Sequence, residues 1–217
     1  MKDPIIKLRN IHFSYEGRKI LEDLNLEIRE GERLGLVGPN GSGKTTLLYI
    51  IMGLLKPERG SVEIFGKIRQ KERDFLEVRQ KIGLLFQDSD SQLFCPTVKE
   101  DIAFGPLNLG LPKGEVEKMV RRILKILGLE GFEDRVTYKL SGGEKKLVSL
   151  GTVLAMNPVC YLLDEPSAGL DEVTVERVLS YLKTYAKTYL IVSHDRKFLE
   201  EATEKIYILR NGKISTL

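Results

Sequence analysis

Residues 38 to 46 are Gly38-Pro39-Asn40-Gly41-Ser42-Gly43-Lys44-Thr45-Thr46, directly after the apolar run Leu34 to Val37. They match the pattern G-x-x-x-x-G-K-[S/T] at every fixed position. The glycines allow successive backbone N–H groups to turn inward around an anion, and the helix that begins near Gly43 adds the positive end of its dipole. Lys44 is placed to reach the β- and γ-phosphates, and Thr45 to offer its hydroxyl to Mg²⁺. The stretch therefore predicts a phosphate-binding loop for a nucleotide, without specifying its task.

Composition limits the other possibilities. The chain has 217 residues, and its 34 basic and 31 acidic side chains give a net charge of +3. This net charge is smaller than the basic excess typical of a DNA-binding domain, so nucleic acid is not an expected partner. The two cysteines, Cys95 and Cys160, form no C-x-x-C pair, which fits a reducing compartment and excludes a zinc framework or a disulfide scaffold. No window approaches the ~18 apolar residues of a membrane span, and the first residues lack an apolar signal core, so we expect a cytosolic protein.

Strand and helix patterns alternate along the chain. Strands are predicted at 7–15, 25–28, 33–37, 61–65, 82–86, 159–163 and 189–193, and helices at 45–54, 97–105, 115–127, 141–156 and 171–185, with the charged stretch 67–81 as a solvated loop and short helix. Such alternation implies a parallel sheet. We predict an α/β fold with a P-loop NTPase core, an antiparallel β part at the N-terminus and a helical insert. The single domain spans 1–217, with a catalytic core at 1–87 and 140–217 and the insert at 88–139.

Two carboxylates end one of the predicted strands. The apolar run from Val159 to Leu163 is followed by Asp164 and Glu165, which places both at the carboxyl edge of the sheet beside the phosphate-binding loop. Asp164 suits a Mg²⁺ site, and Glu165 is placed to orient the water that attacks the γ-phosphate or to accept its proton. An apolar run before Asp-Glu is also an ordinary strand end, and the loop upstream favours the catalytic interpretation.

A second glycine-rich helix start lies far from the first in sequence. It is formed by Ser141, Gly142 and Gly143, and we interpret it as a second anion site. Ser141 and Glu144 also fit the S-x-x-E capping box, in which the glutamate bonds back to the serine N–H, so capping and binding can hold together. Two phosphate-binding helix starts that share one nucleotide are most simply reconciled by a head-to-tail dimer.

Taken together, these motifs resemble those of the ATP-binding-cassette (ABC) ATPases, and the similarity runs from about Ile5 to Ser215. Tyr15 resembles the aromatic residue that stacks on adenine, and Gln87 the glutamine that contacts Mg²⁺ and senses the transport partner. The loop from Ser167 to Asp171 resembles the segment that crosses the dimer interface, and His194 the switch histidine that contacts the γ-phosphate. A structural histidine and a packing tyrosine are the plainer alternatives for His194 and Tyr15.

The resemblance implies a mechanism. Two ATP molecules lie between two copies, each held by the phosphate-binding loop of one copy and by Ser141, Gly142 and Gly143 of the other, so ATP closes the dimer and hydrolysis opens it. Most family members carry glutamine at the place of Glu144. A carboxylate near the phosphates lowers affinity unless it points back into its own capping box, which is our hypothesis.

One branch of the family is especially similar. The segment from Gln87 to Leu111 resembles that of energy-coupling-factor ATPases, the cobalt, nickel and vitamin importers, in which it receives the coupling helices of an integral membrane subunit. Here the segment offers apolar anchors beside acidic residues, a mixture suited to a basic amphipathic helix. The anchors are Leu93, Phe94, Val98, Ile102 and Phe104, and the acidic residues are Asp88, Asp90, Glu100 and Asp101. Packing within the insert is the alternative role for the apolar residues.

The leading hypothesis is thus the ATPase of an importer, bound peripherally at the cytoplasmic face of the cell membrane. The alternatives are an ATPase of another ABC branch, such as an exporter or a lipid-extracting system, and a soluble ABC protein of translation or DNA repair. A nucleotide-binding module without hydrolysis is disfavoured because Glu165 and His194 are both present. A homodimer is favoured over a heterodimer, without an added carboxyl-terminal dimerisation segment. Neither the solute nor the membrane partner is specified by these residues.

Overall fold

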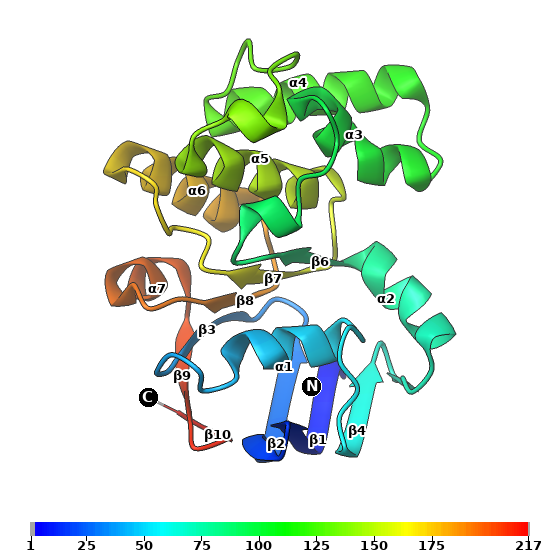
Figure 1. Ribbon diagram of the computed structural model, residues 1–217, viewed down its shortest axis with the longest axis vertical. Coiled ribbons are helices and arrows are strands. Elements are labelled where there is room, and N and C mark those ends of the chain that lie inside the picture. The colour runs from blue at the N-terminus through cyan, green and yellow to red at the C-terminus, as the bar shows by residue number, and fades with distance from the viewer. Residues whose placement is uncertain (1–2, 217) are drawn as a thin grey trace.

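Two β-sheets and the helices packed on them form the computed structural model, which describes residues 3–216 (Figure 1). In these residues a four-stranded sheet has the order β2-β1-β4-β5, and a six-stranded sheet has the order β10-β9-β3-β8-β7-β6. The first sheet is antiparallel, and the second is parallel except for the final hairpin of β9 and β10. This arrangement confirms the predicted α/β fold with an antiparallel part at the N-terminus.

The antiparallel sheet is built from long, half-buried strands. Its strands are β1 (Pro4–Tyr15), β2 (Arg18–Arg29), β4 (Arg59–Ile64) and β5 (Lys67–Ile68). Apolar side chains of β1 and β2 alternate with polar ones, which buries one face against α1. Glu16 and Gly17 both have positive φ in the two-residue turn between these strands, a turn geometry that matches the twist of a hairpin. Tyr15 and Arg18 therefore face each other at the end of the hairpin, next to the turn.

The parallel sheet forms the centre of the molecule. Its strands are β3 (Arg33–Val37), β6 (Ile82–Leu85), β7 (Cys160–Asp164), β8 (Tyr189–Val192), β9 (Lys205–Arg210) and β10 (Lys213–Thr216). Strands β6, β7 and β8 are buried at every position, because helices cover both faces. The neighbouring strands β3, β8 and β7 bring the phosphate-binding loop and the Asp164-Glu165 pair to the same carboxyl edge.

Helices lie on both sides of this sheet (Figure 1). They are α1 (Lys44–Ile51), α2 (Leu76–Lys81), α3 (Val98–Asn108), α4 (Lys113–Leu127), α5 (Gly142–Ala155), α6 (Glu172–Tyr185) and α7 (Arg196–Ala202), with 3₁₀ turns at Glu72–Phe75, Ser89–Ser91 and Thr137–Lys139. One core cluster joins α1, the antiparallel sheet and one face of the parallel sheet. The other joins the opposite face to α5 and α6, and extends to α3 and α4. Within residues 3–216, no helix combines the length and the apolar character needed to cross a bilayer.

Two predictions about secondary structure need correction, and three elements were not predicted. Helix α3 does not stop at Gly105-Pro106 but continues to Asn108, since buried Pro106 sits near the helix end, where its missing N–H removes a single bond. The charged stretch 67–81 is not only a solvated surface, because it contains strand β5 and buries Phe75 and Val78. The elements after residue 193, namely α7, β9 and β10, were not predicted.

The anchor residues proposed for a membrane partner also divide into two groups. Val98 and Ile102 are fully buried in the core, so they cannot contact another protein. Asp101 is buried as well, and its carboxylate accepts hydrogen bonds from the N–H groups of Phe94 and Cys95. Phe94 and Phe104 remain 67% and 46% exposed, and they form an edge-to-face pair with ring centroids 4.7 Å apart.

Candidate active site

The phosphate-binding loop joins β3 to α1 and is shaped by glycine. Gly43 precedes α1 with φ of 100°, and a Cβ at this position would lie 2.7 Å from Ile20 Cγ2. Only glycine adopts this conformation without strain and without displacing β2. Lys44 folds back over the loop, where its Nζ donates hydrogen bonds to the carbonyls of Gly38 at 2.8 Å and Pro39 at 3.1 Å. Burial lowers the pKa of Lys44, and the nearby carboxylates of Glu165 and Asp164 oppose that shift.

Asp164 meets the loop at the end of β7. Thr45 Oγ1 donates a 2.6 Å hydrogen bond to Asp164 Oδ2, which joins two of the three predicted metal ligands although they are far apart in sequence. Burial raises the pKa of Asp164, the bond from Thr45 opposes this rise, and the charge of Glu165 adds to it. A hydroxyl and a carboxylate are oxygen ligands of the kind that Mg²⁺ prefers, and a cation here would relieve the cost of burying the carboxylate. The residues present thus fit a Mg²⁺ ion.

Glu165 is fixed by the strand next to it. Its φ is 51°, a left-handed conformation that is uncommon for glutamate and is often found at functional sites. Ser193 Oγ donates to Glu165 Oε2 at 3.0 Å, and the backbone N–H of His194 donates to Oε1 at 3.1 Å. His194 Nδ1 lies 2.9 Å from Oε2, while its side chain is 76% exposed. The predicted catalytic pair is therefore in contact, with the imidazole facing solvent.

A cavity of about 410 Å³ unites most of the predicted site. Its lining includes Tyr15, Asn40, Gly41, Gly43, Lys44, Thr45, Thr46, Gln87, Asp164 and Glu165. Tyr15 is 46% exposed and packs edge-to-face on Phe13, with its ring available to a ligand. Arg18 and Ile20 of β2 also line this cavity. We did not predict them, because only the hairpin brings β2 beside the loop.

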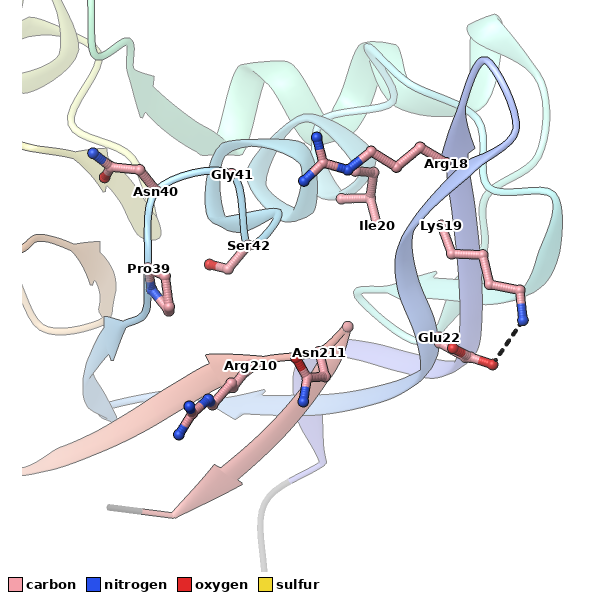
Figure 2. Close-up of a pocket in the computed structure, with 11 residues that line it drawn as sticks. Arg18, Lys19, Ile20, Glu22, Pro39, Asn40, Gly41, Ser42, Arg210 and Asn211 are labelled. Atoms are coloured by element: carbon pink, nitrogen blue, oxygen red, sulfur yellow. Dashed lines mark hydrogen bonds and ion pairs between the residues drawn. The ribbon is translucent and has the colours of Figure 1, made fainter.

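A second cavity of about 400 Å³ adjoins the first and is also lined by the loop (Figure 2). Both cavities are lined by Asn40 and Gly41, whereas Pro39 and Ser42 line only the second one, together with the turn around Asn211. Figure 2 shows cationic side chains of β2 and β9 around it, including Lys19, which is paired with Glu22 at 3.0 Å. Among the described residues, Ser42 Oγ is buried without a hydrogen-bond partner. Gly38 lines neither cavity, and a Cβ there would lie 2.8 Å from Ser42 Oγ and 2.4 Å from the Leu209 carbonyl, so a side chain would disturb the loop.

The second glycine-rich helix start lies outside both cavities. Ser141 is the N-cap of α5, and its Oγ accepts a 3.3 Å hydrogen bond from the N–H of Glu144. Glu144 Oε2 in turn accepts a 2.7 Å bond from Ser141 N–H, which confirms the capping box. A Cβ at Gly143 would lie 3.1 Å from the carbonyl of Gly169, so the loop predicted to cross a dimer interface lies against this helix start. One chain does not bring Ser141, Gly142 and Gly143 to its own phosphate-binding loop.

Comparison with known proteins identifies the family. The family model described as ABC transporter matches residues 21–168, more than half of the chain. The chain belongs to the ABC transporter family. It is 45% identical over 215 residues to an energy-coupling factor transporter ATP-binding protein, EcfA, of Methanocaldococcus jannaschii, with 97% of this chain and 77% of the relative covered. It is 47% identical over 216 residues to a putative ABC transporter ATP-binding protein of Nitratidesulfovibrio vulgaris, with 99% and 79% covered.

Solved structures agree with this result. CbiO1 of Clostridium perfringens, part of the ABC transporter complex CbiONQ, matches with a TM-score of 0.84 and 33% identity over 99% of this chain and 88% of that one. A dimeric ATP-binding cassette, MJ0796, in a post-hydrolysis state with ADP and Pi, matches with a TM-score of 0.88 and 31% identity over 98% of both chains. The predicted ABC ATPase and its resemblance to the energy-coupling-factor branch are confirmed.

One residue of this ABC ATPase that we did not predict joins two parts of the site. Lys146 of α5 is 5% exposed, and its Nζ donates to the carbonyls of Phe86 at 3.2 Å and Gln87 at 2.5 Å. Burial lowers its pKa, and the charge of Asp164 opposes the shift most strongly. In the sequence, Lys146 is one of two adjacent lysines in a charged run that resembles a solvent-exposed surface. Only the fold shows that it binds the backbone of the segment that contains Gln87.

Proposed function

We propose that this chain hydrolyses ATP as a head-to-tail dimer and powers an importer of the energy-coupling-factor type at the cytoplasmic face of the membrane. The observation that carries the proposal is the division of the site. The cavity contains the predicted groups for base, phosphate and metal, whereas Ser141, Gly142 and Gly143 lie outside it. A second copy supplies the missing helix start when the two chains meet head to tail.

The residues of the cavity have distinct roles in this proposal. Tyr15 stacks on the adenine ring, and the N–H groups from Gly38 to Thr46 surround the phosphates. Lys44 leaves its carbonyl partners and turns to the β- and γ-phosphates, a rotation that a flexible four-carbon side chain allows. Thr45, Asp164 and Gln87 hold Mg²⁺, which supplies positive charge to the transferring phosphoryl group when bound.

Hydrolysis then depends on Glu165 and His194. Glu165 orients the attacking water and accepts its proton, because Ser193 Oγ and His194 N–H fix its carboxylate at the edge of the cavity. The exposed imidazole of His194 is free to swing from Glu165 towards the γ-phosphate. The helix start of the partner subunit adds N–H groups to the same phosphate and excludes water from it.

A groove lined by residues of β6 and α3 supports a membrane partner. It has a volume of about 390 Å³, and its lining includes Leu54, Phe86, Phe94, Phe104 and Met156. The exposed pair of Phe94 and Phe104 lies within the predicted contact segment Gln87 to Leu111. A coupling helix of an integral membrane subunit fits this groove with apolar anchors. The names of the relatives EcfA and CbiO1 support the importer branch over an exporter or a lipid-extracting system.

Two experiments test the proposal. The Glu165→Gln chain, in which we expect hydrolysis to be slow and ATP to stay bound, should elute as a dimer with ATP and as a monomer with ADP in size-exclusion chromatography with light scattering. A monomer under both conditions would refute the shared site.

In the second experiment, the tagged chain is recovered from detergent-solubilised membranes of its source, and the proteins that accompany it are identified by mass spectrometry.

The second experiment separates the branches. A small coupling protein together with a solute-binding membrane subunit is the expected result. An export permease, a ribosome or a repair factor would contradict the importer branch. Phe94→Ala/Phe104→Ala should lose the membrane partners, while Tyr138→Ala, which removes an aromatic residue that is 74% exposed outside the segment, should keep them.

A further inference from the structure

Glu144 places a negative charge in the first turn of α5. Under the proposed function, on which this inference rests, that turn binds the γ-phosphate of an ATP held by the partner subunit. The negative charges of the Glu144 carboxylate and of a phosphate bound at the same turn repel each other, and the repulsion grows when the interface excludes water. The helix start can therefore attract phosphate only if the negative charge of this carboxylate is compensated.

Both oxygens of Glu144 have partners on the same chain. Oε2 accepts the 2.7 Å bond from Ser141 N–H in the capping box. Oε1 accepts a 3.3 Å hydrogen bond from Arg135 Nη1, nine residues earlier in the chain. The side chains of Glu144 and Arg135 are 30% and 52% exposed, so the pair lies at the surface of the helix start. Hydrogen bonds with the backbone and side chain of Ser141 lower the pKa of Glu144 most, and the charge of Arg135 adds to this, so the carboxylate is ionised at neutral pH.

Arg135 is held in place by more than Glu144. Its guanidinium lies 3.5 Å from the centroid of the Phe132 ring, a cation–π contact, and its backbone N–H donates to the Phe132 carbonyl at 2.9 Å. The backbone carbonyl of Arg135 accepts from Val98 N–H at the start of α3. The guanidinium is thus preorganised beside α5, and its contact with Glu144 requires little further ordering.

We propose that Arg135 is a positioning residue for the second phosphate half-site. It neutralises Glu144 and holds the carboxylate against its own capping box, away from the nucleotide of the partner subunit. Arg135 acts through Glu144 and does not touch the nucleotide itself. Loss of Arg135 leaves an uncompensated charge at the helix start, whereas loss of the charge on Glu144 makes Arg135 dispensable.

A double-mutant cycle tests this proposal in the Glu165→Gln chain. The ATP concentration that gives half-maximal dimerisation is measured by light scattering for the parent, Arg135→Ala, Glu144→Gln and the double variant. Arg135→Ala should raise this concentration by about five- to tenfold in low salt, with a smaller effect at high salt. Glu144→Gln, which can still form the capping box, should stay within about twofold of the parent, and the double variant should return to that range.

Matched variants separate a pair effect from a general loss of charge. Lys139→Ala removes an exposed cation two residues before Ser141 and should leave dimerisation within about twofold of the parent, and Arg135→Lys should recover part of the loss. A double variant as weak as Arg135→Ala would show that Arg135 meets the nucleotide directly and would overturn the proposal. An unaffected Arg135→Ala chain, or a Glu144→Gln chain that dimerises severalfold more tightly, would also overturn it. Absence of ATP-driven dimers in the parent itself would instead refute the proposed function, and this inference with it.

Discussion

The two helix starts that we predict to bind phosphate, those of α1 and α5, differ in how complete they are. The start of α1 faces a formed cavity, where Asp164 is buried and bonded to Thr45. The start of α5 is exposed at Ser141 and Gly142. At the start of α1, burying the Asp164 carboxylate costs free energy, and a bound cation would offset that cost. At the start of α5, the Glu144 carboxylate caps the helix and is paired with Arg135. The difference supports our proposal that one half-site is ready for nucleotide before assembly and that the other is used only within an assembly.

The largest expected effect is in the formed half-site. Glu165→Gln should lower ATP turnover by roughly 10²–10⁴ while ATP binding is kept, because the amide cannot accept a proton from water but preserves the shape of the side chain. Turnover is measured by phosphate release, and binding by equilibrium titration. Glu200→Gln, an exposed carboxylate of α7, is the control and should leave turnover unchanged. Near-normal turnover of Glu165→Gln would remove Glu165 from the role of base.

The next effect tests the exposed half-site. Gly142→Asp should lower turnover by about 10²-fold or more, because it adds bulk and charge where the partner's phosphate is proposed to bind. A Cβ at Gly142 meets no atom within 4 Å, so the monomer should keep its melting temperature and its affinity for ATP. Gly114→Asp makes the same change in the first turn of α4, where a Cβ also meets no atom within 4 Å, and should be silent. Equal turnover of the two variants would show that α5 does not bind phosphate.

A smaller effect is expected at Lys146, which joins α5 to the segment that contains Gln87. Lys146→Met should lower kcat by about tenfold and change the KM for ATP less, because the glutamine segment loses two hydrogen bonds that fix Gln87. Ser149→Ala is the control on the same helix, since the Ser149 hydroxyl is fully buried without a hydrogen-bond partner among the described residues. The result would be contradicted if Lys146→Met and Ser149→Ala had the same kcat.

The smallest effect concerns stability without nucleotide. Burial raises the pKa of Asp164, so the folded chain holds this proton more tightly than the unfolded chain, and stability falls as the pH rises through the folded pKa. Asp164→Asn removes that loss. The variant should melt a few degrees higher than the parent at pH 8, at roughly 2–4 °C per kcal/mol for a chain of this size, and should melt with the parent below about pH 4. A variant that melts lower at pH 8 would contradict the cost assigned to the buried carboxylate.

Local sequence signals predicted the formed half-site well. The loop glycines, Lys44 and Thr45 are contiguous, and the Asp164-Glu165 pair follows an apolar strand, so strand order alone places them together. The capping box of Ser141 and Glu144 was also predictable, because it depends on a spacing of three residues. The contribution of β2 to the cavity was not predictable, since Arg18 and Ile20 reach it only through the hairpin.

Long-range polar contacts could not be predicted from the sequence, for a different reason. Lys146 and Arg135 have the side chains of ordinary surface cations, and their partners are backbone carbonyls or a distant carboxylate. Conversely, Val98 and Ile102 were assigned to a partner but pack into the core, because helical spacing does not show which face of α3 meets α5. Periodicity therefore predicted the elements, and only the fold distinguished exposed anchors from buried ones.

The central claim is that the two helix starts share one nucleotide across a dimer. A crystal structure of the Glu165→Gln chain with ATP and Mg²⁺ tests this claim most directly. The account predicts that the γ-phosphate held by Lys44 of one chain accepts hydrogen bonds, at roughly 2.7–3.2 Å, from Ser141 and Gly143 of the partner subunit. ATP bound at the formed cavity with Ser141 of both copies facing solvent, or a dimer joined through another face, would contradict it.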